Sequence, residues 1–319
     1  MTRTVPAGPA AATGAIAATA ATGAIAATEA DISCCHSANS TQATAAGWLR
    51  RARPLLGTLV EIGVPADNAD NADSADSADP AAALAAAFDV IARLQQVLSR
   101  FDDDSDLARF ARLPVGHSLA LRPAGARALR AAQALRQASG WLFDISLGSA
   151  PSGWRCQGSR LHKLSPAVQL DLGGIAKGLA LDEAVRTLRR AGCTAGWVNA
   201  GGDLRVFGPV ALPMHLRDEQ RGGVVAIGRL AEGAFATSHY GSGSRSRLHA
   251  PARAGAPRAT PAACHPATLG APPVAPASCH VSVAAPRALW ADALTKVVAL
   301  SGDADHPLLA RLGARAWLH

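Results

Sequence analysis

The chain has 319 residues, and 49% of them are hydrophobic, which is enough to bury a sizeable core in one or two domains. Its formal charge of +7 comes mostly from scattered arginines, and without a dense basic surface carrying aromatic residues the chain is not expected to bind nucleic acid. No run of about eighteen apolar residues is free of charge, so no transmembrane helix is expected.

Residues 1–50 are interpreted as a low-complexity extension rich in Ala, Thr and Gly. The stretch 12–19 recurs as 21–28, and such a segment buries too little apolar area to offset its ordering entropy. Arg3 is its only early cation, and Thr and Gly interrupt its apolar run, so it is a poor secretory signal. The sequence therefore does not assign the protein to a cellular compartment.

Residues 51–319 are expected to form the folded domain, with order beginning near Arg53. Alternating apolar residues indicate a strand, and apolar residues three or four apart indicate helices. An Asn, Ala, Asp and Ser repeat indicates a solvated loop. In chain order, the predicted elements are a strand over 55–64, a loop over 66–80, and helices over 81–98, 107–111 and 123–139.

The acidic run 102–106 has two interpretations. It could hold a cation, or it could start the helix over 107–111 with Asp104 or Ser105 as its N-cap. The second interpretation is favoured, because capping residues commonly precede such a helix.

The most informative stretch is 170–178, in which a short apolar run ends at Asp171, paired glycines follow, and Lys177 stands at the mouth of a helix. Glycines let backbone amides approach a ligand closely, and helix-entry amides with a lysine supply positive potential. The pattern suits an anion. The same Gly-Gly turn also occurs as an ordinary connection between a strand and a helix, without any ligand.

The second half of the chain mixes strands with helices rather than repeating one unit, which favours an α+β fold: a single mixed domain of antiparallel strands and packed helices. The glycine spacing is not that of a nicotinamide-binding βαβ unit, so a dehydrogenase is disfavoured. The predicted elements are strands over 196–199, 203–208, 215–216, 224–230, 234–237 and 281–285, an irregular loop over 241–280, and a helix over 289–300.

The six cysteines show no Cys-x-x-Cys spacing, which argues against a disulfide framework and common zinc modules. Two Cys-His pairs, Cys264-His265 and Cys279-His280, lie in the Pro- and Ala-rich loop. They are interpreted as loop residues rather than as zinc ligands, since structural zinc sites bring tighter ligand pairs.

Several blocks occur together in one order and resemble the ApbE-type flavin transferases, also called FAD:protein FMN transferases. The resemblance covers the chain from about Arg53 to its end and is far more specific than a glycine motif alone. The blocks are Leu56-Gly57-Thr58, Ser99-Arg100-Phe101, Asp104 to Leu107, Phe143 to Gly148 with Trp154, Asp171 to Gly178, Asn199 to Asp203, Ala236-Thr237-Ser238 and Ala291 to Leu294.

This resemblance implies an enzyme that splits the pyrophosphate of FAD with Mg²⁺ and joins FMN through a phosphoester to a Ser or Thr of an acceptor protein. Such a transfer needs neutralised phosphate charge and an acceptor oxygen held in line, and Mg²⁺ prefers hard oxygen ligands. By the same resemblance, the metal ligands would be Asp292, Thr295 and the carbonyl of Gly174. The FAD contacts would be Leu56, Phe101, Leu142, Phe143, Asp144, Asp171, Lys177, Thr237 and Cys264.

For several of these residues a structural role is the alternative. Phe101 and Phe143 could pack in a core, and Asp292 could be an ordinary helix-start acid. Asp203 is interpreted as structural, whereas Ser238 stands where the family lines its site.

The chain departs from the family pattern in two places. The family usually has Thr four residues after the metal-binding Asp, but here that position is Lys296, and Thr295 is rotated from it by about 100° on a helix. Lys296 could instead meet a phosphate and replace part of the metal's charge. The late His-rich block is also altered, so the base that deprotonates the acceptor is assigned to His249 first and to His265 second.

Two alternative functions use the same residues. One is an FAD pyrophosphatase that releases FMN and AMP, and the other is a protein that binds FAD without turnover. The sequence leaves open the acceptor protein and the oligomeric state.

Overall fold

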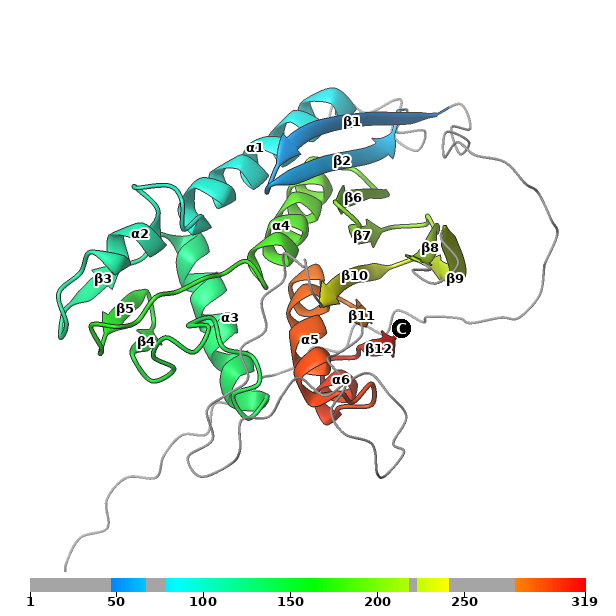
Figure 1. Cartoon of the computed structure of the whole chain (residues 1–319). Coiled ribbons are helices and arrows are strands. Elements are labelled where there is room, and N and C mark those ends of the chain that lie inside the picture. The colour runs from blue at the N-terminus through cyan, green and yellow to red at the C-terminus, as the bar shows by residue number, and fades with distance from the viewer. Residues whose placement is uncertain (1–46, 67–78, 218–222, 241–278) are drawn as a thin grey trace, which may run out of the picture.

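A seven-stranded antiparallel sheet forms the centre of the fold (Figure 1). The computed structural model describes residues 47–66, 79–217, 223–240 and 279–319. The strand order across the sheet is β1-β2-β6-β7-β10-β11-β12. Its strands are β1 (Trp48–Leu55), β2 (Thr58–Pro65), β6 (Gly196–Ala200), β7 (Asp203–Phe207), β10 (Gly233–Tyr240), β11 (Cys279–Ala285) and β12 (Arg315–Leu318).

Three helices pack against one another and against this sheet: α1 (Pro80–Leu98), α4 (Ala176–Arg190) and α5 (Ala288–Ser301). The main hydrophobic core lies between these helices and the sheet, and α1 contributes Leu84, Phe88 and Ile91 to it. Asp79 caps α1, since its Oδ1 accepts from the N–H of Ala81 at 2.8 Å.

A close crossing joins α4 to α5. A Cβ added at Gly178 would lie 2.2 Å from the carbonyl oxygen of Ala288, so only glycine allows this approach. The crossing brings the first turn of α4 close to α5.

The opposite face of the sheet carries a smaller apolar cluster that includes Trp197, Met214 and Phe235. The hairpin of β8 (Leu212–Arg217) and β9 (Val224–Leu230) supplies part of this cluster. Trp197 and Val198 follow each other on β6 and enter different clusters, as the alternation of strand side chains requires.

A second layer lies on the side of α1 and α4 that is away from the central sheet (Figure 1). It holds α3 (Pro123–Ala138) and a three-stranded sheet of order β3-β5-β4, while α6 (Pro307–Arg311) lies just before β12. The remaining bounds are α2 (Asp106–Ala111), β3 (Ser118–Ala120), β4 (Trp154–Gln157) and β5 (Arg160–Lys163).

The predicted fold class is confirmed: the described residues form a mixed α+β domain with antiparallel strands. The predicted helices are also present, and Ser105 rather than Asp104 caps α2, with its Oγ 2.9 Å from the N–H of Ala108.

Three local predictions need correction. The strand predicted over 55–64 corresponds to β2, which begins only at Thr58 after a turn that joins it to β1. Order also begins before Arg53, because β1 starts at Trp48 inside the segment assigned to the extension. The Arg-rich β1 has no apolar alternation and is held by backbone pairing with β2, so its residues gave no signal. Cys279 and His280, which were assigned to the loop predicted over 241–280, begin β11, and the rest of that predicted loop lies outside the described residues. The short strands β3, β4, β5 and β12 were not predicted.

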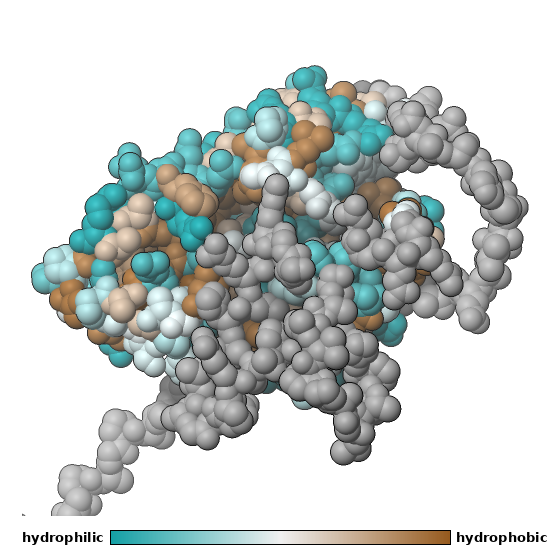
Figure 2. Space-filling model, in the orientation of Figure 1, coloured by the Kyte–Doolittle hydropathy of each residue, from teal (hydrophilic) through white to brown (hydrophobic). Residues whose placement is uncertain are grey.

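One described helix, α1, is long and apolar enough to pass a length and composition test for a membrane span. Its apolar stripe belongs to the hydrophobic core, as in many helices that pass this test. On the face shown in Figure 2, hydrophobic and hydrophilic residues are interspersed over the described part of the chain.

Candidate active site

The first part of the candidate site lies where α4 begins beside β7. Lys177 stands in the first turn of α4, and its Nζ lies 2.5 Å from Oδ2 of Asp203, the first residue of β7. The Asp203 side chain is 5% exposed and that of Lys177 is 34% exposed, so the pair is buried at its carboxylate end and open at its cation.

The second part lies on α5. Lys296 Nζ is 2.6 Å from Oδ1 of Asp292 and donates to the Asp292 carbonyl oxygen at 2.9 Å, one helical turn earlier. Their side chains are 15% and 2% exposed. A Cβ at Gly174 would lie 2.9 Å from Cε of Lys296, so the turn before α4 packs directly on the lysine stem.

Hydroxyl groups on β10 and α5 form a hydrogen-bonded network next to this pair. Thr295 Oγ1 donates to the Asp292 carbonyl at 2.7 Å and is 2.9 Å from Ser238 Oγ and 3.2 Å from Tyr240 Oη. All three hydroxyl-bearing residues are buried. The network joins the middle of α5 to β10.

Burial and paired charges set the protonation of the site. Burial disfavours charged Lys177, but the carboxylates of Asp203 and Asp292 outweigh it and raise the pKa of Lys177 above its ordinary value. Burial disfavours charged Lys296 too, but Asp292 above all raises its pKa well above the ordinary value. Burial raises the pKa of Asp203, and the charge of Asp292 adds to the shift. Both lysines are therefore ammonium ions at neutral pH.

A third group of predicted residues lies on two adjoining loops. The N–H of Asp171 donates to the Ile145 carbonyl at 2.8 Å, which joins the stretch 170–175 to the segment holding Leu142, Phe143 and Asp144. Phe143 is buried, whereas Asp144 is partly exposed and accepts from Ser146 N at 3.0 Å.

Phe101 reaches the same region through Arg100. The guanidinium of Arg100 lies 3.5 Å from Asp171 Oδ2 and stacks over the Phe101 ring at 4.7 Å. Phe101 is 83% exposed, so it does not pack in the core, and an exposed aromatic ring is available to a ligand ring. Asp171 Oδ1 accepts from Gly173 N at 2.7 Å and shapes the glycine turn.

The structure thus brings Gly174, Lys177, Asp292, Thr295 and Lys296 together. Thr237 is separate, because neighbouring strand residues face opposite ways and its Oγ1 lies 2.8 Å from Ser282 Oγ. Leu56 lies in the turn between β1 and β2 in a left-handed conformation, φ 56°, with its N–H donating to Gln95 Oε1 at 2.6 Å. His249, Cys264 and His265 lie outside the described residues.

Three residues were given too little weight or missed. Asp203 was interpreted as structural, yet it pairs with Lys177. Tyr240 was missed, although it is the only tyrosine of the chain and ends the strand that carries Ser238. Arg100 was missed as a partner of Asp171, since a contact between residues 71 positions apart leaves no local pattern.

The residues around Asp292 do not fit a divalent cation in this arrangement. Lys296 occupies Oδ1 and the carbonyl of Asp292, and the Thr295 hydroxyl is bonded within its own network. Two carboxylate oxygens of the site, Asp292 Oδ2 and Asp203 Oδ2, are buried without a hydrogen-bond partner, and the second is already ion-paired with Lys177, whereas Mg²⁺ takes about six oxygen ligands. Among the described residues, no group of three or more His, Cys, Asp or Glu could hold a metal ion.

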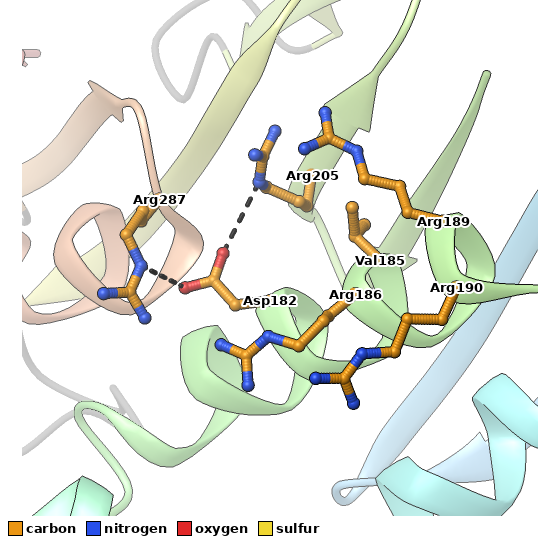
Figure 3. Close-up of a pocket in the computed structure, with 7 residues that line it drawn as sticks. All are labelled: Asp182, Val185, Arg186, Arg189, Arg190, Arg205 and Arg287. Atoms are coloured by element: carbon orange, nitrogen blue, oxygen red, sulfur yellow. Dashed lines mark ion pairs between the residues drawn. The ribbon is translucent and has the colours of Figure 1, made fainter. Parts of the chain in front are cut away.

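A pocket lined by residues outside this site contains five arginines from α4, β7 and the residue preceding α5 (Figure 3). Asp182 lies at its centre, 3.4 Å from Nε of both Arg205 and Arg287. The same carboxylate accepts from the N–H groups of Ala288 and Leu289 at 3.0 and 3.1 Å and so caps α5. We assign Asp182 a structural role.

The fold and site together define an α+β protein whose buried carboxylates hold two lysine ammonium groups beside a helix start, an arrangement suited to an anionic ligand. A family model described as the ApbE family matches residues 56–317. The chain belongs to the ApbE family.

Relatives agree with this membership. The chain is 30% identical over 165 residues to an FAD:protein FMN transferase of Rhodobacter capsulatus, a match that covers 50% of the chain. The match spans 30% of that relative's length.

Solved structures share the fold. The flavin transferase ApbE of Vibrio cholerae matches with a TM-score of 0.64 at 15% identity, over 85% of this chain and 93% of that one. The apo flavinyl transferase ApbE of Pseudomonas stutzeri matches with 0.62 at 22% identity, over 85% and 90% of the two chains. The ApbE protein of Thermotoga maritima matches with 0.63 at 20% identity, over 85% and 94%.

Proposed function

We propose that this protein is an FAD:protein FMN transferase, which cleaves FAD and attaches FMN through a phosphoester to a Ser or Thr of an acceptor protein. The observation that carries the proposal is the pair of ammonium groups, Lys177 and Lys296, held on Asp203 and Asp292 beside the start of α4. The pyrophosphate of FAD carries two negative charges, and each ammonium group can donate charge-assisted hydrogen bonds to its oxygens. Family membership and the name of the Rhodobacter relative support the same reaction.

The exposed ring of Phe101 and the adjoining loop of Leu142 to Asp144 supply a surface for the ring systems of FAD. Asp171 holds the glycine turn and Arg100 together at this surface. FAD would then lie from Phe101 toward the lysines, with its pyrophosphate at the first turn of α4.

In the transfer, the acceptor hydroxyl oxygen forms a bond with the FMN phosphorus, and the bond from that phosphorus to the bridging oxygen breaks. AMP leaves with the electron pair, and the hydroxyl proton passes to a base, for which His249 is the first candidate and His265 the second. Lys177 and Lys296 would stabilise the charge that develops on the phosphate oxygens and on AMP. The resemblance implies Mg²⁺ as well, but the residues around Asp292 do not fit it, so no step of this proposal passes through a metal.

The test is to incubate the purified protein with FAD, alone and with a cell extract. We expect AMP release measured by chromatography and a protein band that keeps flavin fluorescence on a denaturing gel, with mass spectrometry showing FMN on Ser or Thr. AMP and FMN without any labelled protein would indicate the pyrophosphatase instead. FAD binding without AMP would leave a non-catalytic binder.

A further inference from the structure

The position beside Asp292 is filled by a side chain of the protein itself. Lys296 Nζ lies 2.6 Å from Asp292 Oδ1, 2.9 Å from its carbonyl oxygen and 3.4 Å from Ser238 Oγ. These contacts place one ammonium group among three oxygens, in the way an oxygen-coordinated cation would be placed. The cation at this position is therefore the ammonium group of Lys296.

The packing around the lysine stem leads it to this position. Gly174 presents no Cβ, and a methyl group there would come within 2.9 Å of Cε and 3.4 Å of Cδ of Lys296. The missing side chain leaves the passage through which the stem runs from α5 to the site. Gly174 thus fits the lysine sterically, whether or not its carbonyl binds a ligand.

Thr295 is held away from the ligand side. Its hydroxyl donates to the Asp292 carbonyl and contacts Ser238 and Tyr240, all of them buried. To ligate a cation together with Asp292, Thr295 would have to leave these partners, and Lys296 would have to leave its carboxylate. Both movements would break charge-assisted or buried hydrogen bonds.

The repulsion between like charges points the same way. Lys177 and Lys296 match Asp203 and Asp292 one for one, so the four groups sum to zero. A divalent cation would add two positive charges next to two ammonium groups that already interact with each other unfavourably. A bound pyrophosphate instead adds negative charge to a site whose cations are fixed in place.

We propose that the Lys296 ammonium takes the place of a divalent cation beside Asp292, so that Lys177 and Lys296 together hold the pyrophosphate of FAD and the protein acts without a divalent metal. This inference rests on the proposed function for its ligand, FAD. Lys296 touches the phosphate in this arrangement and Thr295 only positions Asp292.

The first test compares the full-length protein in EDTA and in Mg²⁺. We expect the FAD dissociation constant, measured by titration calorimetry, and the rate of AMP release to agree within about twofold between the two conditions. Titration with Mg²⁺ alone should show no binding. Loss of FAD affinity and AMP release in EDTA, with recovery in Mg²⁺, would overturn the inference.

The second test removes the charge. Lys296→Met should weaken FAD binding in EDTA by at least about tenfold, because a charge-assisted contact to phosphate is lost. Lys296→Arg should keep part of the affinity, and Arg190→Met, which removes a charge at the far end of α4, should leave it unchanged. Unaltered FAD affinity in Lys296→Met would contradict the inference.

The two proposals fail differently. If the wild-type protein binds FAD equally in EDTA and Mg²⁺ but releases no AMP in either, the transferase proposal fails while the role of Lys296 in binding stands. If AMP release requires Mg²⁺, the transferase proposal stands and the role of Lys296 fails. Should Lys296→Met not fold, the wild-type comparison in EDTA and Mg²⁺ decides alone.

Discussion

At the scale of single residues, the site consists of two lysines that are charged because each is held by a buried carboxylate. Lys177 depends on Asp203 and Lys296 on Asp292, and the partners come from different elements in the first case and from one helical turn in the second. Removing one member of a buried pair is costly, because the other is left as an uncompensated charge. Variants of these residues must therefore be tested for both ligand affinity and stability.

Lys177→Met tests the proposed contact between the Lys177 ammonium group and the pyrophosphate of FAD. We expect the FAD dissociation constant to rise by at least about tenfold, because an ammonium group at the helix start is lost from the pyrophosphate. Titration calorimetry measures this, with Arg190→Met as the matched control for loss of one positive charge from α4. Equal affinities of the two variants for FAD would contradict the assignment of Lys177.

The same substitution predicts a pH-dependent loss of stability. Burial and Asp292 already raise the pKa of Asp203, and removing Lys177 raises it further, so the folded state holds a proton that the unfolded state releases above about pH 4. The free energy of unfolding of Lys177→Met should therefore fall, relative to wild type, as the pH rises from the folded-state pKa of Asp203 in wild type to its higher folded-state pKa in the variant.

Urea unfolding at pH 5 and pH 8 measures this difference. Lys177→Met combined with Asp203→Asn removes the titrating group, so its free energy of unfolding should differ from that of Asp203→Asn by the same amount at both pH values. A Lys177→Met deficit that does not change with pH would show that Asp203 is not the group responsible.

At the scale of elements, the geometry of the site depends on the crossing of α4 and α5. Gly178 is one residue from Lys177, and the carbonyl of Ala288 lies where a side chain at Gly178 would be. Asp182, one turn further along α4, caps α5 at the same crossing. Together these contacts fix the position of Asp292 relative to Lys177.

Gly178→Ala tests this crossing. In an ordinary exposed helix the change stabilises by about 1 kcal/mol, but here the contact with backbone should reverse the sign and destabilise by about 2–3 kcal/mol. Urea unfolding measures the free energy, and the FAD dissociation constant should rise because the two lysines move apart. A stabilised Gly178→Ala variant would show that α4 and α5 separate without cost.

At the scale of the whole molecule, one central sheet carries β7 and β10 under the starts of α4 and α5, and loops from the second layer bring Asp144, Asp171 and Phe101 to the same region. The proposed FAD surface therefore draws on segments from across the chain. A ligand that binds them all should stabilise the entire fold.

FAD is predicted to raise the melting temperature. At a concentration 100 times its dissociation constant, a ligand adds about 2.7 kcal/mol, which corresponds to roughly 5–10 °C for a domain of this size. Thermal unfolding with FAD measures the shift, and riboflavin at the same concentration, which lacks the pyrophosphate, should give a smaller one. Equal shifts would argue against the lysine pair as the phosphate site.

Local sequence alone determined the helices, the glycine turn at 170–178 and the ordered blocks that resemble the ApbE family, because periodicity, capping and turn residues act over a few positions. It also singled out Lys296 as the departure from the family pattern. Only the tertiary structure decided where that lysine points, that Asp203 serves Lys177 rather than the fold alone, and that Thr295 faces Ser238 and Tyr240. The reason is physical: these contacts join residues up to 57 positions apart, and their geometry follows from how helices pack on the sheet, which no local pattern records.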